Sequence, residues 1–142
     1  MKLRTGLGVL AYIVPTFALG FVWHLVLFKD YYDALAMYRH DVIIPFGLLS
    51  MAIQSVLFAI VYERLFRQMA GSVAIRTLLY GAFGAALSWS FTTIAVAAKN
   101  VMTSVPDYLA IETAFTLVQW AMVAPLTVSV YAGQRGNTAI PT

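Results

Sequence analysis

The chain alternates four long apolar stretches with short polar connections. The apolar stretches run over about 5–28, 42–66, 75–98 and 108–132. A helix needs about 20 mostly apolar residues to cross the hydrocarbon core of a bilayer, and each stretch meets that length. We therefore expect an all-α fold, a four-helix transmembrane bundle that forms one unit over 1–133, followed by a flexible tail over 134–142.

The composition agrees with this pattern. Hydrophobic residues make up 61% of the chain and charged residues 11%. A soluble domain has roughly a quarter charged residues and about half apolar ones, so this chain has too little polar surface to cover a water-soluble globule. It also has no cysteine, which excludes disulfides and thiolate ligands, and no motif identifies a cofactor.

Basic residues favour one side of the predicted bundle. The N-terminal end, the second connection and the tail hold six of them: Lys2, Arg4, Arg64, Arg67, Arg76 and Arg135. The first and third connections hold only Lys29, Arg39 and Lys99. Because positive residues stay cytoplasmic, both termini are expected inside a bacterial inner membrane. The net charge of +3 is thus explained by membrane orientation, and nucleic acid is not an expected partner.

The opposite side is rich in tyrosines and carboxylates. Five of the six acidic residues fall there: Asp30, Asp33, Asp41, Asp107 and Glu112. In the first connection Tyr31, Leu35 and Tyr38 recur at i, i+4 and i+7, the spacing of one helical face. This pattern predicts a short helix at the membrane interface, with its tyrosine rings at headgroup level.

The third span carries a stripe of small residues. Gly81 and Ala85 are four residues apart, and Gly84, Ser88 and Thr92 follow the same spacing. Small side chains let two helix backbones approach closely inside a membrane. Plain packing is the ordinary explanation of such a stripe, and it predicts that the third span is the central helix.

Two ionisable residues lie about one turn inside the outer boundary. His24 lies near the end of the first span and Glu112 near the start of the fourth. Ionisable residues inside a membrane are candidates for functional sites, so a pocket around this pair is one hypothesis. The other hypothesis is that both side chains reach the headgroup region and are hydrated there.

Polar and aromatic residues extend the candidate ligand site. Gln54 and Gln119 fall toward mid-membrane, where they could hydrogen-bond each other or a ligand, although structural bonds of this kind occur in most bundles. Trp23 precedes His24 and Trp120 follows Gln119, and both tryptophans are included in the candidate set.

A metal site is a weaker alternative. His24 and His40, with one of Asp30, Asp33 or Asp41, would be an acceptable ligand set for a transition metal. The spacings H-x-x-x-H and E-x-x-H, which place ligands on one helix face, are absent.

Three segments carry a resemblance to a known class. The first span ends with Ala18-Leu19-Gly20-Phe21-Val22-Trp23, then Leu27-Phe28 and tyrosines; the third is rich in glycine; the fourth reads LVQWAMVAPLTVSVYAG. In these features the chain resembles small four-helix bacterial membrane proteins of unknown function. The resemblance covers nearly the whole chain and implies only the four-span architecture, with no activity or site residue.

Three functions are compatible with these patterns. The first is a non-enzymatic accessory subunit that packs against other membrane chains or a second copy, since the chain is small and lacks catalytic spacing. The second is an outward-facing binder or transporter of a small molecule, lipid or metal ion that uses His24 and Glu112. An enzyme acting on a lipid or quinone ranks last, because no acid–base pair stands at a fixed spacing.

Overall fold

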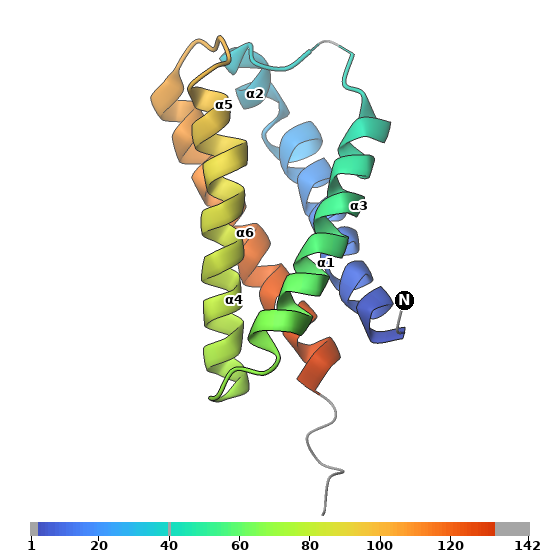
Figure 1. The fold of residues 1–142 in the computed structure, drawn as a ribbon. Coiled ribbons are helices and arrows are strands. Elements are labelled where there is room, and N and C mark those ends of the chain that lie inside the picture. Colours follow the sequence, from blue (N-terminus) through green and yellow to red (C-terminus); the bar gives the residue numbers. More distant parts are fainter. Residues whose placement is uncertain (1–2, 40, 133–142) are drawn as a thin grey trace, which may run out of the picture.

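The computed structural model describes residues 3–39 and 41–132, and within these ranges the chain is helical between short turns and has no strand. Its elements in chain order are α1 (Leu3–Val22), the π-helical turn η1 (Trp23–Leu27), α2 (Lys29–Leu35), α3 (Ile44–Val61), the π-helical turn η2 (Tyr62–Phe66), α4 (Val73–Ser88), the π-helical turn η3 (Trp89–Ile94), α5 (Ala95–Ala97) and α6 (Val105–Ala132). Consecutive elements join into four long rods that stand side by side (Figure 1).

Each rod is long and apolar enough to cross a membrane. The four candidate spans are Leu3–Leu27, Ile44–Phe66, Val73–Ala97 and Val105–Ala132. Their ends fall within three residues of the expected boundaries, so the prediction of four membrane-length helices is confirmed. The predicted tail over 134–142 lies outside the described residues.

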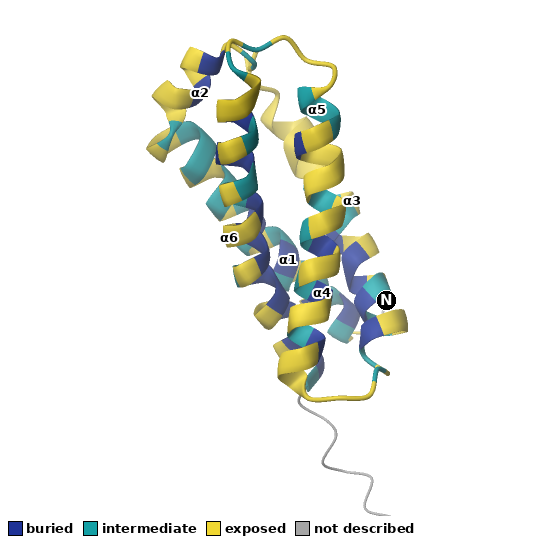
Figure 2. Ribbon diagram, turned by 90° about the vertical axis from the view of Figure 1, so that its left-hand side faces the viewer, coloured by how far each residue is buried: buried dark blue, intermediate teal, exposed yellow. Residues whose placement is uncertain are grey.

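The outer faces of the rods are apolar and exposed. Leu78 is 71% exposed, Phe91 69% and Phe46 68%, and exposed positions run along the outside of α3 and α4 (Figure 2). Lipid, unlike water, accepts such a surface without cost, because it is as apolar as the side chains themselves. The structure therefore has the character of a multi-pass membrane protein.

The first and fourth rods, and not the third, hold the middle of the bundle. Helix α6 packs against both α1 and α4, and α1 packs against both α3 and α6, whereas α4 packs mainly on α6. Buried residues follow one another along α6 from Tyr108 to Tyr131, while α4 buries Arg76, Tyr80 and Gly84. The prediction that the third span is central is therefore wrong.

The stripe of small residues on α4 receives one large side chain. A Cβ added to Gly84 would come within 2.1 Å of the Trp120 ring, so only glycine fits there. The Trp120 indole N–H donates to Ser88 Oγ at 3.0 Å. A Cβ on Gly81 would lie 3.1 Å from Ala124. Small residues thus mark where α4 approaches α6 most closely, which does not require α4 to be central.

The bundle is closed at one end and open at the other. At the closed end, the four rods share one core, made of Tyr12, Phe58, Tyr62, Phe66, Tyr80, Trp120, Val123, Ala124, Val128 and Tyr131. At the other end a smaller core holds Tyr32, Leu35, Tyr108 and Ile111, to which α3 contributes no residue. There α3 diverges from α4 and α5 (Figure 1).

The short helix after the first rod presents a different face from the one expected. Tyr32 and Leu35 are buried, while Tyr31 is 41% exposed. The helix ends at Ala36, whose φ of 52° is left-handed, and Tyr38 lies beyond that end. The prediction that Tyr31, Leu35 and Tyr38 share one helical face is therefore wrong, because the helix is too short to include all three.

Candidate functional site

The structure brings His24 and Glu112 into contact at the open end. His24 Nε2 lies 3.2 Å from Glu112 Oε1, although the two residues are 88 positions apart. Their side chains are 18% and 8% exposed, respectively. His24 belongs to η1, and π-helical turns inside longer helices often occur at functional sites. The packing of α1 on α6 is what makes the two residues neighbours.

The hydrogen bonds around the pair define its protons. His24 Nδ1 lies 2.9 Å from the Gly20 carbonyl oxygen, and a carbonyl only accepts, so Nδ1 carries a hydrogen. Glu112 Oε1 also accepts a bond of 2.6 Å from the Tyr32 hydroxyl. Nε2 and Oε1 are therefore joined by one shared hydrogen. The histidine and the carboxyl group together carry no net charge, whichever of the two atoms holds that hydrogen.

Tyr32 holds the carboxylate in place and was missed in the sequence. Its side chain is 0% exposed, and burial, followed by the charge of Glu112, raises the pKa of its hydroxyl. The hydroxyl therefore stays protonated and remains a donor. The available signal is the Tyr31–Tyr32 pair, since adjacent residues on a helix point about 100° apart and one of the two rings can turn inward.

Aromatic rings enclose the ion pair. The Tyr38 ring stacks on Tyr32 at a centroid distance of 5.2 Å, and the edge of His24 meets Phe115 at 4.6 Å. Rings around a charged pair keep water away and strengthen its electrostatic attraction. The site is thus a partly dry polar centre within an apolar wall.

A cavity of about 530 Å³ opens beside this centre. It lies between α1 and α3 on one side and η3, α5 and α6 on the other, and its lining includes His24, Tyr38, Ser50, Gln54, Ser88, Thr92, Asn100, Tyr108, Glu112 and Gln119. Between these polar groups the walls are apolar, with Phe17, Phe21, Met51 and Phe115 among them. Small-molecule sites have similar volumes, roughly 300–1,000 Å³, and similar linings.

A second polar centre lies deeper in the cavity. The Tyr12 hydroxyl donates to Gln54 Oε1 at 2.9 Å and lies 3.5 Å from Gln119 Nε2, which donates to it. Gln119 also donates to Thr16 at 3.4 Å, and Gln54 donates to Ser50 at 3.0 Å. The two glutamines are thus linked through Tyr12, a residue the sequence analysis did not select. Its spacing of four from Thr16 was the available signal.

Two of the predicted ligand residues do not line the cavity. Trp120 lies on the α4 side of α6, against Gly84. Trp23 packs against Phe28 and Phe115, with centroid distances of 4.6 and 5.8 Å. Their assignment to the pocket is corrected, because residues adjacent on a helix point about 100° apart.

The small residues of the third span also differ in whether they line the cavity. Ala85 packs against the core of the closed end. Thr92 is exposed and lines the cavity, and its carbonyl accepts a bond of 2.8 Å from the Tyr108 hydroxyl. Thr92 therefore belongs to the cavity wall.

The metal candidates are not gathered into one site. Within residues 3–39 and 41–132, no three His, Asp or Glu side chains could hold a metal ion together. His40 lies outside the described residues. Asp41 pairs with Arg39 at 3.1 Å, and His24 is engaged with Glu112.

The chain was compared with known proteins and structures. No protein-family model, no curated protein and no solved structure matches it.

Proposed function

We propose that this protein binds a small molecule in the cavity between α3 and η3, with His24 and Glu112 as the polar anchor. The observation that carries the proposal is the His24–Glu112 contact, which lies in the lining of a cavity of about 530 Å³. A charged pair inside a membrane is costly and usually faces a pathway or a ligand. The apolar walls beside the pair suit a ligand that partitions into lipid.

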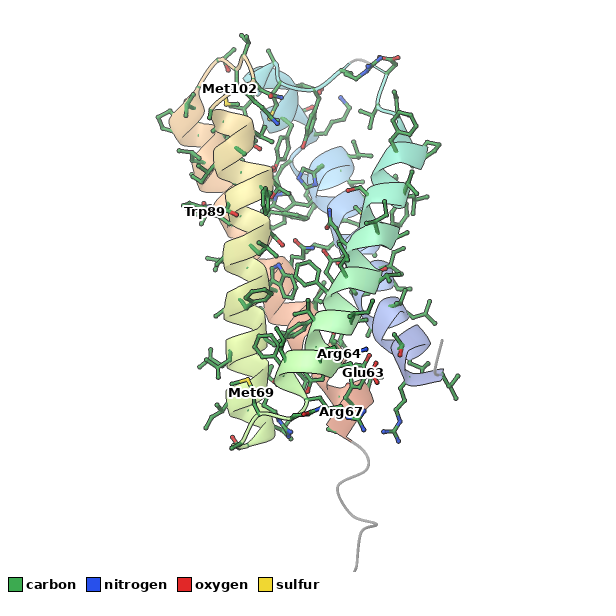
Figure 3. The ribbon with its side chains drawn as sticks, in the orientation of Figure 1. Glu63, Arg64, Arg67, Met69, Trp89 and Met102 are labelled. Carbon is green, nitrogen blue, oxygen red and sulfur yellow. The ribbon has the colours of Figure 1, made fainter. Side chains whose placement is uncertain are left out.

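The cavity is proposed to face outward across a bacterial inner membrane, with both termini inside. Glu63, Arg64 and Arg67 lie at the end opposite α2 (Figure 3). Arginines bind anionic headgroups, and positive residues remain cytoplasmic. On this orientation α2 lies at the outer interface, with Tyr31 exposed.

Retention of a molecule by the purified protein tests the proposal. A Cβ added to Gly47, which lines the cavity, would meet no atom within 4 Å, so Gly47→Phe fills the cavity without a backbone clash. Ala18→Phe is the matched control, because Ala18 is exposed and does not line the cavity. Each protein is extracted in native lipid particles, and bound molecules are identified by mass spectrometry.

A molecule enriched with the wild type and with Ala18→Phe, and lost with Gly47→Phe, is the expected result. The same extract from all three proteins would contradict the proposal.

An interaction subunit is the second candidate, and one observation favours it. At the open end α3 packs mainly on α1, which leaves its other side available to a helix of another chain or a second copy. Particle mass measured in native lipid tests this candidate. A larger complex supports it, whereas a solitary monomer contradicts it.

A further inference from the structure

We infer that the cavity takes an uncharged, elongated amphiphile with a hydrogen-bond donor, such as a hydroxyl, at one end and a second polar group about 10 Å away. This inference rests on the proposed function and specifies the ligand class. Three features of the cavity carry it: its charge balance, one unused carboxylate oxygen, and the distance between its two polar centres.

The cavity carries no net charge. Among the described residues of its lining, His24 and Glu112 are the charged pair, and no lysine, arginine or aspartate accompanies them. His24 and Glu112 share one hydrogen, so the pair has no net charge. A charged ligand would therefore lose its hydration without gaining a counterion. An uncharged ligand avoids this cost.

One oxygen of Glu112 is left for the ligand. Oε1 is occupied by both His24 and Tyr32. Oε2 makes no hydrogen bond with any residue the structure describes, although Glu112 lines the cavity. A carboxylate oxygen only accepts, so the matching ligand group is a donor. Since the ligand is uncharged, a hydroxyl or an amide N–H fits, and an ammonium group does not.

The two polar centres are separated along the cavity. Glu112 and Gln119 are seven residues apart on α6, which corresponds to about 10 Å at 1.5 Å per residue. Phe115 lies between them on α6, and Phe17 and Phe21 face the same interval from α1. The ligand therefore has an apolar middle, a donor that reaches Glu112, and a polar group that reaches Gln54 and Gln119.

Four eight-carbon probes separate these requirements: octane-1,8-diol, 1-octanol, octanoate and octylammonium. Binding of each is measured by equilibrium dialysis against lipid nanodiscs that contain the full chain, and binding to empty nanodiscs is subtracted. The proteins are the wild type, Gly47→Phe, Glu112→Gln and the control Ala18→Phe.

The diol is expected to bind about tenfold more tightly than 1-octanol, because one hydrogen bond is lost with the second hydroxyl. It should also bind at least about tenfold more tightly than either charged probe. Gly47→Phe should abolish binding of the diol, and Glu112→Gln should weaken binding of the diol about tenfold. Ala18→Phe should leave binding of the diol unchanged.

Cavity-dependent binding of octanoate or octylammonium as tight as that of the diol would overturn the inference and leave the proposed function standing. Binding of the diol that Gly47→Phe does not reduce would also overturn the inference. In that case the extraction experiment decides the proposed function independently.

Discussion

The Tyr32 hydroxyl and Glu112 Oε1 lie 2.6 Å apart and join the short helix α2 to helix α6. This bond fixes the carboxylate so that the same oxygen also meets His24 Nε2 at 3.2 Å. A residue of the short helix α2, outside the four spans, thus determines the geometry of the pair within them. Any ligand at Glu112 would depend on this connection.

The bond predicts a loss of stability in alkaline solution. Burial and the charge of Glu112 raise the pKa of Tyr32 above the value of about 10 that tyrosine has in an unfolded chain. Its contribution is therefore present below about pH 10 and lost as the pH rises beyond that value. The difference in Tm between the wild type and Tyr32→Phe should narrow between about pH 9 and about pH 11. Tyr31→Phe is the control, since Tyr31 is exposed; a gap that stays constant for Tyr32→Phe would contradict the prediction.

The ion pair predicts non-additive mutations. His24→Gln or Glu112→Gln leaves its partner charge poorly compensated at 18% or 8% exposure, and each should cost about 3 kcal/mol. The double variant should lose less stability than the sum of the two single losses, with a coupling energy of roughly 1–3 kcal/mol. The free energy of unfolding, measured in detergent for all four proteins, gives this coupling. Strictly additive losses would mean that the two side chains do not interact.

Three glycines predict a graded response to alanine. Gly84→Ala places a Cβ 2.1 Å from the Trp120 ring and should cost about 1–3 kcal/mol. Gly81→Ala, at 3.1 Å from Ala124, should cost less. Gly47→Ala meets open space and should be neutral or add about 0.5–1 kcal/mol through helix propensity. Thermal unfolding ranks the three variants, and equal losses would contradict the packing of α4 on α6.

The proposed orientation predicts which cysteines can be labelled from outside. The natural chain has none, so single substitutions have a clean background. Val101 is 92% exposed near α2, and Gln68 is exposed near the opposite end. In intact cells, a membrane-impermeant maleimide should label Val101→Cys and should reach Gln68→Cys only after permeabilisation. The reverse labelling pattern would show that the protein has the opposite orientation in the membrane.

The four spans could be predicted because bilayer thickness imposes a length on any apolar helix. Which helices pack against each other could not be predicted, since an apolar helix surface does not specify its neighbour. The contact between His24 and Glu112 could be predicted only if the first and fourth spans were assumed to be neighbours. The structure shows that α1 and α6 are neighbours.

The remaining errors have local physical causes. Trp23 and Trp120 were predicted to line the pocket because they are adjacent in sequence to His24 and Gln119. Adjacent residues on a helix point about 100° apart, and both tryptophans face away from the pocket. The glycine stripe was interpreted as a central helix, although it accommodates the ring of Trp120. The left-handed Ala36 ends α2 early, which no feature of its sequence indicated, and Tyr38 therefore leaves the helix.

A density map of the protein in native lipid decides whether the cavity beside His24 and Glu112 holds a ligand. We expect non-protein density between α3 and η3, in contact with Glu112 and extending toward Gln54 and Gln119. We also expect this density to be absent in Gly47→Phe and present in Ala18→Phe. A map in which α3 closes onto η3 and leaves no space beside His24 and Glu112 would contradict the account.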